Sequence, residues 1–256
     1  MANTINLRPP YLLFIGDLRE PTYAKTALGL VHWRRDRVVG QLRLAQDAVD
    51  LGVPDMDVET AAAAGAGSLI IGVATVGGVI PDSWWHVIRA AARHGLDIVS
   101  GLHGRLADNA ELVADAERSG ANLIDVRVPP ANIPVGTGRK RSGKRVLTVG
   151  TDCAVGKKYS ALALTEALQS LGAKATFRAT GQTGIMIAGE GVPIDAVVAD
   201  FISGAAEALS PDNDADHWDV IEGQGALFHP GYAGVSLGLL HGSQPDAIVV
   251  CHEALR

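Results

Sequence analysis

The fold is decided by one stretch in the second half of the chain, Val149-Gly150-Thr151-Asp152-Cys153-Ala154-Val155-Gly156-Lys157-Lys158-Tyr159-Ser160. An apolar run over 145–149 precedes it and predicts a strand, and the run over 160–168 predicts a helix after it. A glycine-rich turn between a strand and a helix is the setting of a phosphate-binding loop (P-loop), because the glycines let backbone N–H groups turn inward. Lys157 would then reach over the phosphates, so the stretch predicts phosphate binding.

The residues after Lys157 distinguish this loop from the standard motif. The standard motif continues with Ser or Thr, whose hydroxyl holds Mg²⁺, whereas Lys158 and Tyr159 stand here. Five residues separate Gly150 from Gly156, one more than in the usual pattern. The sequence therefore supports phosphate binding better than it supports nucleotide hydrolysis.

Composition narrows the classes of partner. The chain has 256 residues, 47% of them hydrophobic and 20% charged, which is typical of a globular protein. A formal net charge of -6 argues against a nucleic-acid partner, because phosphate neutralisation needs clustered Lys and Arg. The one basic cluster, over 139–145, lies among Gly and Pro and is predicted to be a solvated linker.

Cysteine usage and hydropathy bear on the compartment. Cys153 and Cys251 cannot form a disulfide framework, and neither has the spacing of zinc ligands. The N-terminus lacks the signature of a signal peptide, and no apolar run approaches the roughly 18 residues of a membrane span. We therefore expect a cytoplasmic protein with a small-molecule substrate, no membrane partner and no resident metal.

Short apolar runs alternate with helical patterns and predict an α/β protein with mostly parallel sheets. Strands are predicted over 11–15, 69–74, 97–100, 123–126, 145–149, 173–179, 196–200, 218–221 and 247–250. Helices are predicted over 84–94, 109–119, 160–168 and 201–209. The strand over 247–250 has the apolar character of a central strand.

A stretch rich in Pro and Gly divides this pattern. We predict a Rossmann-like N-terminal domain over residues 1–128, a linker over 129–144 and a P-loop domain over 145–256. A central strand is normally followed by a covering helix, so we expect the P-loop domain to lack its C-terminal part. No G-x-G-x-x-G fingerprint is present in the first domain, so no NAD site is inferred.

Two further glycine-containing loops follow predicted strands, where open α/β sheets place their ligands. One begins at Glu222 and continues through Gly223, Gln224 and Gly225. Its acid is a candidate for orienting a metal-bound water or a substrate amine, or for a simple ion pair with Lys157. The other loop, over 180–184, offers backbone donors and hydroxyls for an anion.

Two single residues are candidates with competing structural interpretations. Asp200, at the end of a predicted strand, has the placement of a metal-binding Walker B acid or of a helix cap. His229 could act as a general base near neutral pH, although a lone histidine is more often structural. His241 and His252 are weaker candidates, because no comparable loop chemistry follows either of them.

Together these motifs resemble a known family. The loop over 150–157 and the Glu-Gly loop at 222 are similar to those of dethiobiotin synthetase. The ordered set 150–157, 180–184, 222–225, His229-Pro230 and 237–242 resembles a P-loop family formerly described only as a domain of unknown function. Its characterised members are D-glutamate N-acetyltransferases (DgcN), and the resemblance covers nearly the whole chain.

The resemblance implies an enzyme that transfers an acetyl group from acetyl-CoA to the amine of D-glutamate or a similar amino acid, with the P-loop holding the phosphates of CoA. It implies His229 and Glu222 as catalytic residues, with a homo-oligomeric assembly as the expected state. Arg178, Gly223, Gln224 and Gly225 are then expected to bind the substrate. The expected cofactor-binding residues are Gly150, Thr151, Asp152, Cys153, Ala154, Val155, Gly156, Lys157, Lys158, Tyr159, Gly181, Gln182, Thr183 and Gly184.

The alternative is a ligase or kinase that uses Mg-ATP, as dethiobiotin synthetase does. In that case Asp200 and Glu222 would act around the metal ion with Lys157 and Asp152. A third possibility is a regulatory module that binds CoA or a nucleotide without turnover. Metal-dependent ADP release would distinguish the second activity from the first, since acetyl transfer releases a thiol.

Overall fold

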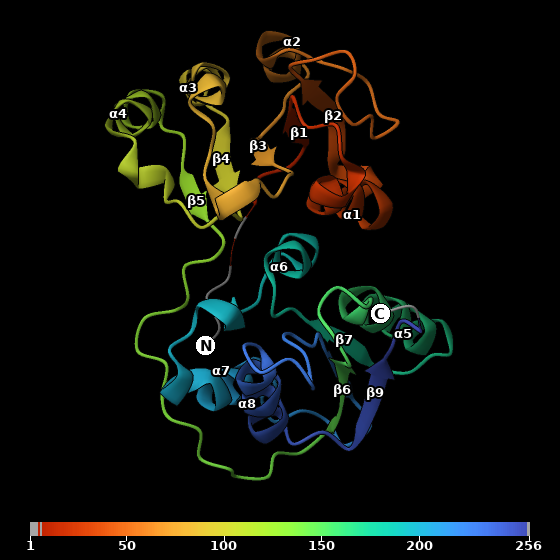
Figure 1. Ribbon diagram of the computed structural model, residues 1–256. Coiled ribbons are helices and arrows are strands. Elements are labelled where there is room, and N and C mark those ends of the chain that lie inside the picture. The colour runs from red at the N-terminus through yellow and green to blue at the C-terminus, as the bar shows by residue number, and fades with distance from the viewer. Residues whose placement is uncertain (1–4, 6, 255–256) are drawn as a thin grey trace. The chain divides into compact units, whose positions relative to one another are not determined.

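A computed structural model describes residue 5 and residues 7–254, and it separates into two compact units between Arg127 and Val128. Each unit is built on one sheet in which all paired strands are parallel, with helices packed against it (Figure 1). The predicted α/β class with mostly parallel sheets is therefore confirmed. No helix in this described part of the chain is long and apolar enough to cross a membrane.

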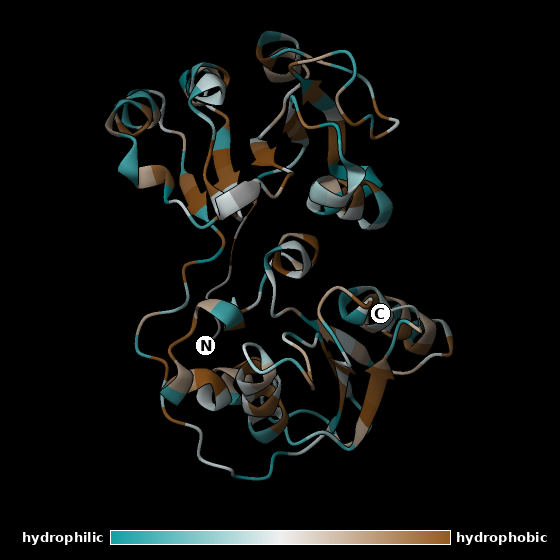
Figure 2. Ribbon diagram, viewed as in Figure 1, coloured by the Kyte–Doolittle hydropathy of each residue, from teal (hydrophilic) through white to brown (hydrophobic). Residues whose placement is uncertain are grey.

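The first unit contains a five-stranded sheet in the order β2-β1-β3-β4-β5. Its strands are β1 (Tyr11–Gly16), β2 (Val38–Arg43), β3 (Ser68–Ile71), β4 (Asp97–Ser100) and β5 (Leu123–Asp125). The hydrophobic colour of the strands in Figure 2 matches their burial, because a parallel sheet is covered on both faces. Four of these strands agree with the predicted positions, and β2 was not predicted.

The helices of the first unit are α1 (Lys25–Trp33), α2 (Val58–Ala63), α3 (Trp85–Arg93) and α4 (Ala110–Ser119). Short 3-10 helices lie at Pro21–Ala24, Arg35–Arg37, Val76–Gly78, Asp82–Trp84 and Leu106–Asp108. In Figure 1, α2, α3 and α4 lie along one face of the sheet and α1 lies on the other. Helix α4 begins where the Asn109 side chain accepts a bond from Leu112 N at 2.9 Å, and it ends at Gly120 with φ 77°.

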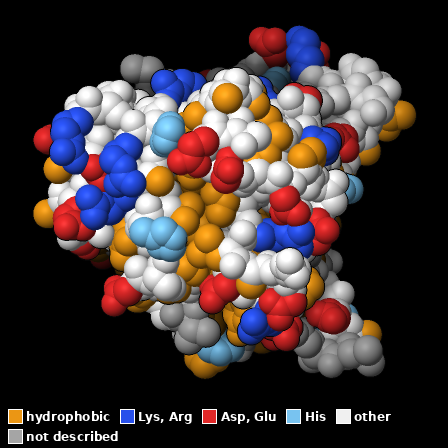
Figure 3. Space-filling view, turned by 90° about the horizontal axis from the view of Figure 1, so that it is seen from above, with side chains coloured by type: hydrophobic (Ala, Val, Ile, Leu, Met, Phe, Trp, Pro, Cys, Tyr) orange, Lys and Arg blue, Asp and Glu red, His pale blue; other side chains and the backbone are white. Residues whose placement is uncertain are grey.

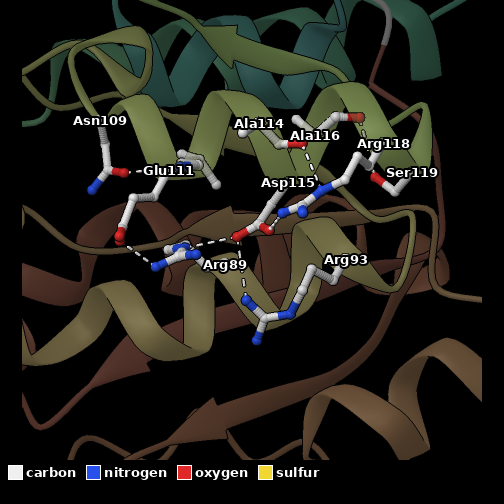
Figure 4. Close-up of polar contacts among 10 residues, drawn as sticks. Arg89, Arg93, Asn109, Glu111, Ala114, Asp115, Ala116, Arg118 and Ser119 are labelled. Atoms are coloured by element: carbon white, nitrogen blue, oxygen red, sulfur yellow. Dashed lines mark hydrogen bonds and ion pairs between the residues drawn. The ribbon is translucent and has the colours of Figure 1, made fainter.

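Helices α3 and α4 are joined by a buried carboxylate (Figure 4). Arg89 Nε and Arg93 Nη1 of α3 lie 2.7 and 3.2 Å from Asp115 Oδ2, and Arg118 donates to Oδ1. Arg89 also pairs with Glu111. The Asp115 side chain is only 1% exposed, so three guanidinium groups compensate a charge that water does not reach.

The space between α2 and α3 forms a groove of about 620 Å³. Figure 3 shows hydrophobic side chains in the hollow of this face, with charged groups around it. Leu42, Met56, Val58, Val87 and Ala90 are among its apolar lining residues.

The second unit has a four-stranded sheet in the order β7-β8-β6-β9. Its elements are β6 (Lys144–Gly150), α5 (Lys157–Ser170), β7 (Ala175–Arg178), α6 (Gln182–Ala188), α7 (Ile202–Leu209), β8 (Trp218–Ile221), α8 (Ala233–Ser243) and β9 (Ala247–Cys251). Leu147 and Val149 of β6 pack in the core under α7 and α8, whereas Val146 faces the core under α5. This alternation is the two-residue period of a strand covered on both faces.

One strand prediction was wrong. Residues 196–200 form no strand: they lie in 3-10 turns at Ile194–Ala196 and Ala199–Phe201, whose backbone bonds are local. Of this apolar run only Val197 is buried, in the core under α7 and α8, and Val198 is 66% exposed. The predicted strand over 247–250 is present as β9, which within the described residues pairs with β6 and leaves Ile248 and Val250 about half exposed.

The stretch predicted as a linker packs against the second unit. Thr137 donates to the Glu207 carboxylate, and Gly204 of α7 lies directly against the Pro134 carbonyl. The expectation of a solvated basic cluster holds for Arg139, Lys140 and Lys144 and was wrong for Arg141 and Arg145, which are 6% and 3% exposed. Arg141 donates from Nη2 to the carbonyls of Gly242 and Ser243, while its Nε and Nη1 have no hydrogen-bond partner among the described residues. Arg145 donates to carbonyls of four residues, which replace the water that it loses.

Candidate functional site

The loops that follow β6, β7, β8 and β9 meet at one edge of the second sheet. All four strands are parallel, so their carboxyl ends lie at the same edge, which is where open α/β sheets bind ligands. Leu227 N donates to Gly150 O at 2.8 Å, and Thr180 Oγ1 donates to Glu222 O at 2.7 Å. Three of the predicted motifs are therefore joined by direct hydrogen bonds.

The loop after β6 has the backbone of a P-loop. Ala154 and Gly156 both have positive φ, 59° and 101°, in the left-handed region. A Cβ on Gly150 would lie 2.8 Å from Asp152 O and 2.9 Å from Lys157 Nζ, so only glycine fits the close turn. The loop ends at Lys157, the first residue of α5.

Lys157 is held inside this loop. It is 7% exposed, and its Nζ donates to Asp152 O at 2.9 Å. Burial lowers the pKa of its ammonium, and the nearby Cys153, Cys251, Asp152 and Glu222 oppose that shift. The first turn of α5 contains no acidic residue, so no side chain compensates the positive end of the helix. A bound anion would compensate both this helix end and the Lys157 ammonium, which burial separates from water.

Lys158 and Tyr159 complete the start of α5. Lys158 Nζ lies 4.4 Å from the centre of the Tyr159 ring, within the range of a cation–π contact. Burial raises the pKa of the Tyr159 phenol, although 40% of the residue remains exposed. Lys158 also acts electrostatically on Glu222, so both members of the Lys pair bear on the same acid.

Glu222 is a buried acid at the end of β8. It is 2% exposed, and its Oε2 accepts bonds from Thr180 N at 2.9 Å and Gly181 N at 3.1 Å. Burial raises the pKa of its carboxyl to about 7, against the opposing effects of these two N–H donors and of Lys158. Among the described residues no ion pair with Lys157 lies within 4.0 Å, so the simple salt-bridge interpretation fails.

Two glycines leave room for this carboxylate. A Cβ on Gly184 would lie 2.2 Å from Glu222 Oε2, and a Cβ on Gly181 would lie 2.2 Å from Gln224 Nε2 and 3.4 Å from Glu222 Oε1. Residues 182–184 are not a loop as predicted, because α6 starts at Gln182 with Gly181 as its N-cap. The Gln224 amide and Glu222 Oε1 therefore meet over Gly181.

The rest of the loop after β8 is tied down by its own backbone. Gly223 N donates to Thr148 Oγ1 at 2.9 Å, and a Cβ on Gly223 would lie 1.7 Å from Thr148 O. Ser236 Oγ of α8 donates to Gln224 O at 2.8 Å. Gly225 has φ 73°, which turns the chain toward the segment that carries His229.

His229 lies on the surface of this segment. Its ring stacks on Tyr232 with centroids 4.5 Å apart, and its Nδ1 accepts a bond from Gly231 N at 3.2 Å. A neutral imidazole that accepts at Nδ1 carries its proton on Nε2. In this arrangement His229 can donate from Nε2, and it can accept a proton only after releasing Gly231.

Arg178 and Asp200 have surroundings that differ from those expected. Arg178 ends β7, but its Nε lies 2.8 Å from Asp219 Oδ1 and its Nη1 lies 3.9 Å from Glu190 Oε1, so buried and surface acids already engage it. Asp200 is exposed in a 3-10 turn and does not end a strand, so the Walker B placement was wrong.

His252 is a site residue that the sequence reasoning undervalued. It directly follows β9, and its Nδ1 lies 2.9 Å from Thr151 Oγ1 of the P-loop. Thr151 N also donates to Cys251 O at 3.1 Å. The signal was available: a histidine directly after a predicted parallel strand lies at the ligand-binding edge.

Similarity to known proteins agrees with this arrangement. Residues 40–129 match the Rossmann-like domain DUF1611_N and residues 134–256 match the P-loop domain DUF1611_C, each described as a domain of unknown function. Two curated relatives are named D-glutamate N-acetyltransferase. The protein from Tritonibacter scottomollicae is 54% identical over 98% of this chain and 75% of its own length. The protein from a Pseudoalteromonas species is 50% identical over 98% and 76%.

The chain belongs to this family of D-glutamate N-acetyltransferases. A solved DUF1611 family protein from Anabaena variabilis has the same fold, with a TM-score of 0.83 and 36% identity over 95% of this chain and 74% of that one. The predicted Rossmann-like and P-loop domains, the family and the enzyme class are thus confirmed.

Proposed function

We propose that this protein transfers the acetyl group of acetyl-CoA to the amine of D-glutamate, at the carboxyl edge of the sheet in the second unit. The observation that carries the proposal is the pair of buried ionisable groups at that edge. Lys157 is a buried cation inside an anion-binding loop, and Glu222 is a buried acid whose pKa is raised to about 7. The names of the two relatives supply the substrate class.

The P-loop is suited to the diphosphate of CoA. Its left-handed turns, the start of α5 and the Lys157 ammonium provide backbone donors and charge for an anion. A diphosphate that is not cleaved needs no hydroxyl after the lysine to hold Mg²⁺, which agrees with Lys158 and Tyr159 at those positions. Lys158 adds a second cation at the same helix start.

Glu222 would orient the substrate ammonium and take its proton. Both backbone donors go to Oε2, so Oε1 is the oxygen directed to a ligand beside Gln224. An amine attacks a thioester only as the free base, and a base works best when its pKa lies near the working pH. The amine nitrogen then bonds to the acetyl carbon and the carbon–sulfur bond breaks. The nitrogen loses its second proton, and the thiolate of CoA takes up one proton and leaves as the thiol.

In the observed arrangement His229 would act as a hydrogen-bond donor, and it could act as a base only after its Nδ1 releases Gly231 N. With Nδ1 accepting from Gly231 N, its Nε2–H can donate to a substrate carboxylate or to the departing sulfur. We therefore assign the first proton transfer to Glu222 and a supporting proton or carboxylate contact to His229. A His229→Gln variant, which keeps a side-chain donor, should lose less activity than Glu222→Gln.

The direct test is thiol release from acetyl-CoA with D-glutamate, L-glutamate or other amino acids, each with and without EDTA. The proposal expects thiol release that depends on D-glutamate and is insensitive to EDTA. ADP release from Mg-ATP, abolished by EDTA, would support the ligase or kinase instead. Tight CoA binding without any thiol release would indicate a regulatory module.

A further inference from the structure

We infer that the first unit carries a second binding site, a crevice between β1 and β3 that accepts a small aromatic amine. Nothing in the acetyl-transfer proposal uses this crevice. It lies entirely within the first unit, and it is lined by the segment after β1 and the segment after β3.

Topology selects this position. In the order β2-β1-β3-β4-β5, the chain moves from β1 outward to β2 and then returns across β1 to β3. The loops that follow β1 and β3 therefore run toward opposite faces of the sheet, which leaves a crevice at the carboxyl ends of these two strands. Such a switch point is where doubly wound sheets bind ligands, and the crevice of about 500 Å³ is the size of a small-molecule site.

The walls of the crevice are mainly apolar and aromatic. Its apolar lining is formed by Leu18, Tyr23, Ala74, Val79, Pro81 and Trp84. Trp84 is 1% exposed and packs edge-on against Phe14 with centroids 5.2 Å apart, so it forms a rigid floor. Tyr23 and Val79 are 43% and 62% exposed, which leaves their surfaces available to a flat apolar ligand.

A close approach at the end of β1 holds this floor in place. A Cβ on Gly16 would lie 2.3 Å from the Trp84 ring, and Gly16 has φ 64°. The indole Nε1–H donates to Asp17 Oδ1 at 3.0 Å. The glycine thus lets the ring reach the strand end, and the ring in turn fixes the carboxylate at the mouth of the crevice.

The charge at the mouth selects an amine. Asp17, Arg19 and Glu20 line it, and Arg19 Nε is already 2.6 Å from Asp47 Oδ2. The carboxylates of Asp17 and Glu20 therefore leave the mouth negatively charged. Of the two oxygens of Asp17, Oδ1 accepts the bond from Trp84, and Oδ2 accepts none from another described residue. A cation with an aromatic body satisfies the apolar walls, the Tyr23 ring and the acidic mouth together.

Three indoles that differ in one group test this inference: tryptamine is cationic, tryptophol is neutral and indole-3-acetate is anionic at pH 7. Each is titrated into the ¹⁵N-labelled full chain while the indole N–H signal of Trp84 is followed by NMR. That signal is assigned by elimination with Trp33→Phe, Trp85→Phe and Trp218→Phe. We expect a saturable shift with tryptamine, a weaker one with tryptophol and none with indole-3-acetate.

Two variants locate the site. Val79→Trp fills the crevice from an exposed position and should abolish the shift, whereas Val135→Trp, at an equally exposed valine of the second unit, should leave it unchanged. Asp17→Asn keeps an acceptor for the Trp84 indole and removes the charge. It should raise the Kd of tryptamine roughly two- to fivefold, the effect of one exposed ion pair, and leave the Kd of tryptophol unchanged. Equal binding of the three indoles, no shift of Trp84, or an unchanged shift in Val79→Trp would each overturn the inference.

Discussion

Asp115 of the first unit and Glu222 of the second are both almost completely buried carboxylates, and the two are held in opposite ways. Asp115 of the first unit is 1% exposed and faces three arginines. Glu222 of the second unit is 2% exposed and is held by two backbone N–H groups. The hydrogen bond from Arg89 leads the effects that lower the pKa of Asp115, whereas burial raises the pKa of Glu222 to about 7.

The difference separates a structural acid from a chemical one. A carboxylate surrounded by guanidinium groups stays ionised at any physiological pH, so Asp115 can join helices but cannot exchange a proton there. A carboxyl that is buried with neutral donors gains and loses its proton near neutral pH. The second unit therefore carries the acid that is poised for proton transfer, beside the buried cation of its P-loop.

The largest expected effect concerns the pH dependence of stability. The folded pKa of Glu222 lies above its ordinary value of 4.5, so the native state holds the extra proton between about pH 4.5 and 7. Stability is full below that window, falls as pH rises through it and levels off above pH 7. Glu222→Gln should remove this fall, which amounts to about 3 kcal/mol.

Urea unfolding of both proteins at pH 5 and pH 8 measures this. The free energy of unfolding of the variant, relative to that of the wild type, should increase from pH 5 to pH 8. If the stability difference between the two proteins is the same at both pH values, Glu222 does not titrate near neutrality.

The second prediction concerns the anion site. Lys157→Met keeps the length of the side chain and removes its charge, so the Kd for CoA should rise roughly 10- to 100-fold, the value of one charge-assisted hydrogen bond. Calorimetric titration with CoA measures it. Lys140→Met is the matched control, because Lys140 is exposed on the segment before β6. If CoA binds both variants with equal affinity, Lys157 and the P-loop do not hold the phosphates of CoA.

A smaller effect is expected from a single methyl group beside Glu222. In Gly184→Ala the new Cβ must displace Oε2, which lies 2.2 Å away, so kcat should fall about tenfold, since a misplacement of about 1 Å costs up to ~100-fold. Gly234→Ala in α8 adds the same methyl group where nothing lies within 4 Å. Comparable kcat values for the two alanine variants would mean that the position of the carboxylate is unimportant.

The smallest effect on activity is expected at the other acid. Asp115→Asn leaves three arginines without their counter-ion, so Tm should drop at neutral pH while kcat stays unchanged. Because the pKa of Asp115 is lowered in the folded protein, its stabilisation is present above the ordinary aspartate pKa and is lost as pH falls through the folded value. A Tm difference that persists undiminished at strongly acidic pH would argue against this ion-pair network.

The sequence predicted which loops lie at the carboxyl edge of the second sheet better than it predicted the burial and the partners of the side chains there. Strand–turn–helix patterns placed the loops at Gly150, Thr180 and Glu222, and parallel topology then brought those loops together. The burial of Glu222 could not be predicted, because it depends on the close approach of Gly184 from α6, a helix that the polar sequence of its first turn concealed. Arg178 illustrates the same limit, since its partner Asp219 comes from the neighbouring strand.

Errors in the fold have a related cause. An apolar run shows neither that a segment is buried nor what pairs with it. Residues 196–200 were predicted as a strand, although only Val197 is buried and 3-10 turns supply the backbone bonds. The burial of Arg141 and Arg145 was missed because the carbonyl partners of Arg141 and two of the four partners of Arg145 lie far away in sequence.

The account rests on Glu222 as the group that takes the amine proton. The most direct test is the pH dependence of kcat/KM for acetyl transfer from acetyl-CoA to D-glutamate, in the wild type and in Glu222→Gln. The account predicts that the wild-type profile rises through a midpoint at a pH of about 7 and that the variant loses this step together with ~10²-fold or more of its activity. The same step at full height in Glu222→Gln would contradict it and would assign the proton to another group, with His229 the next residue to test.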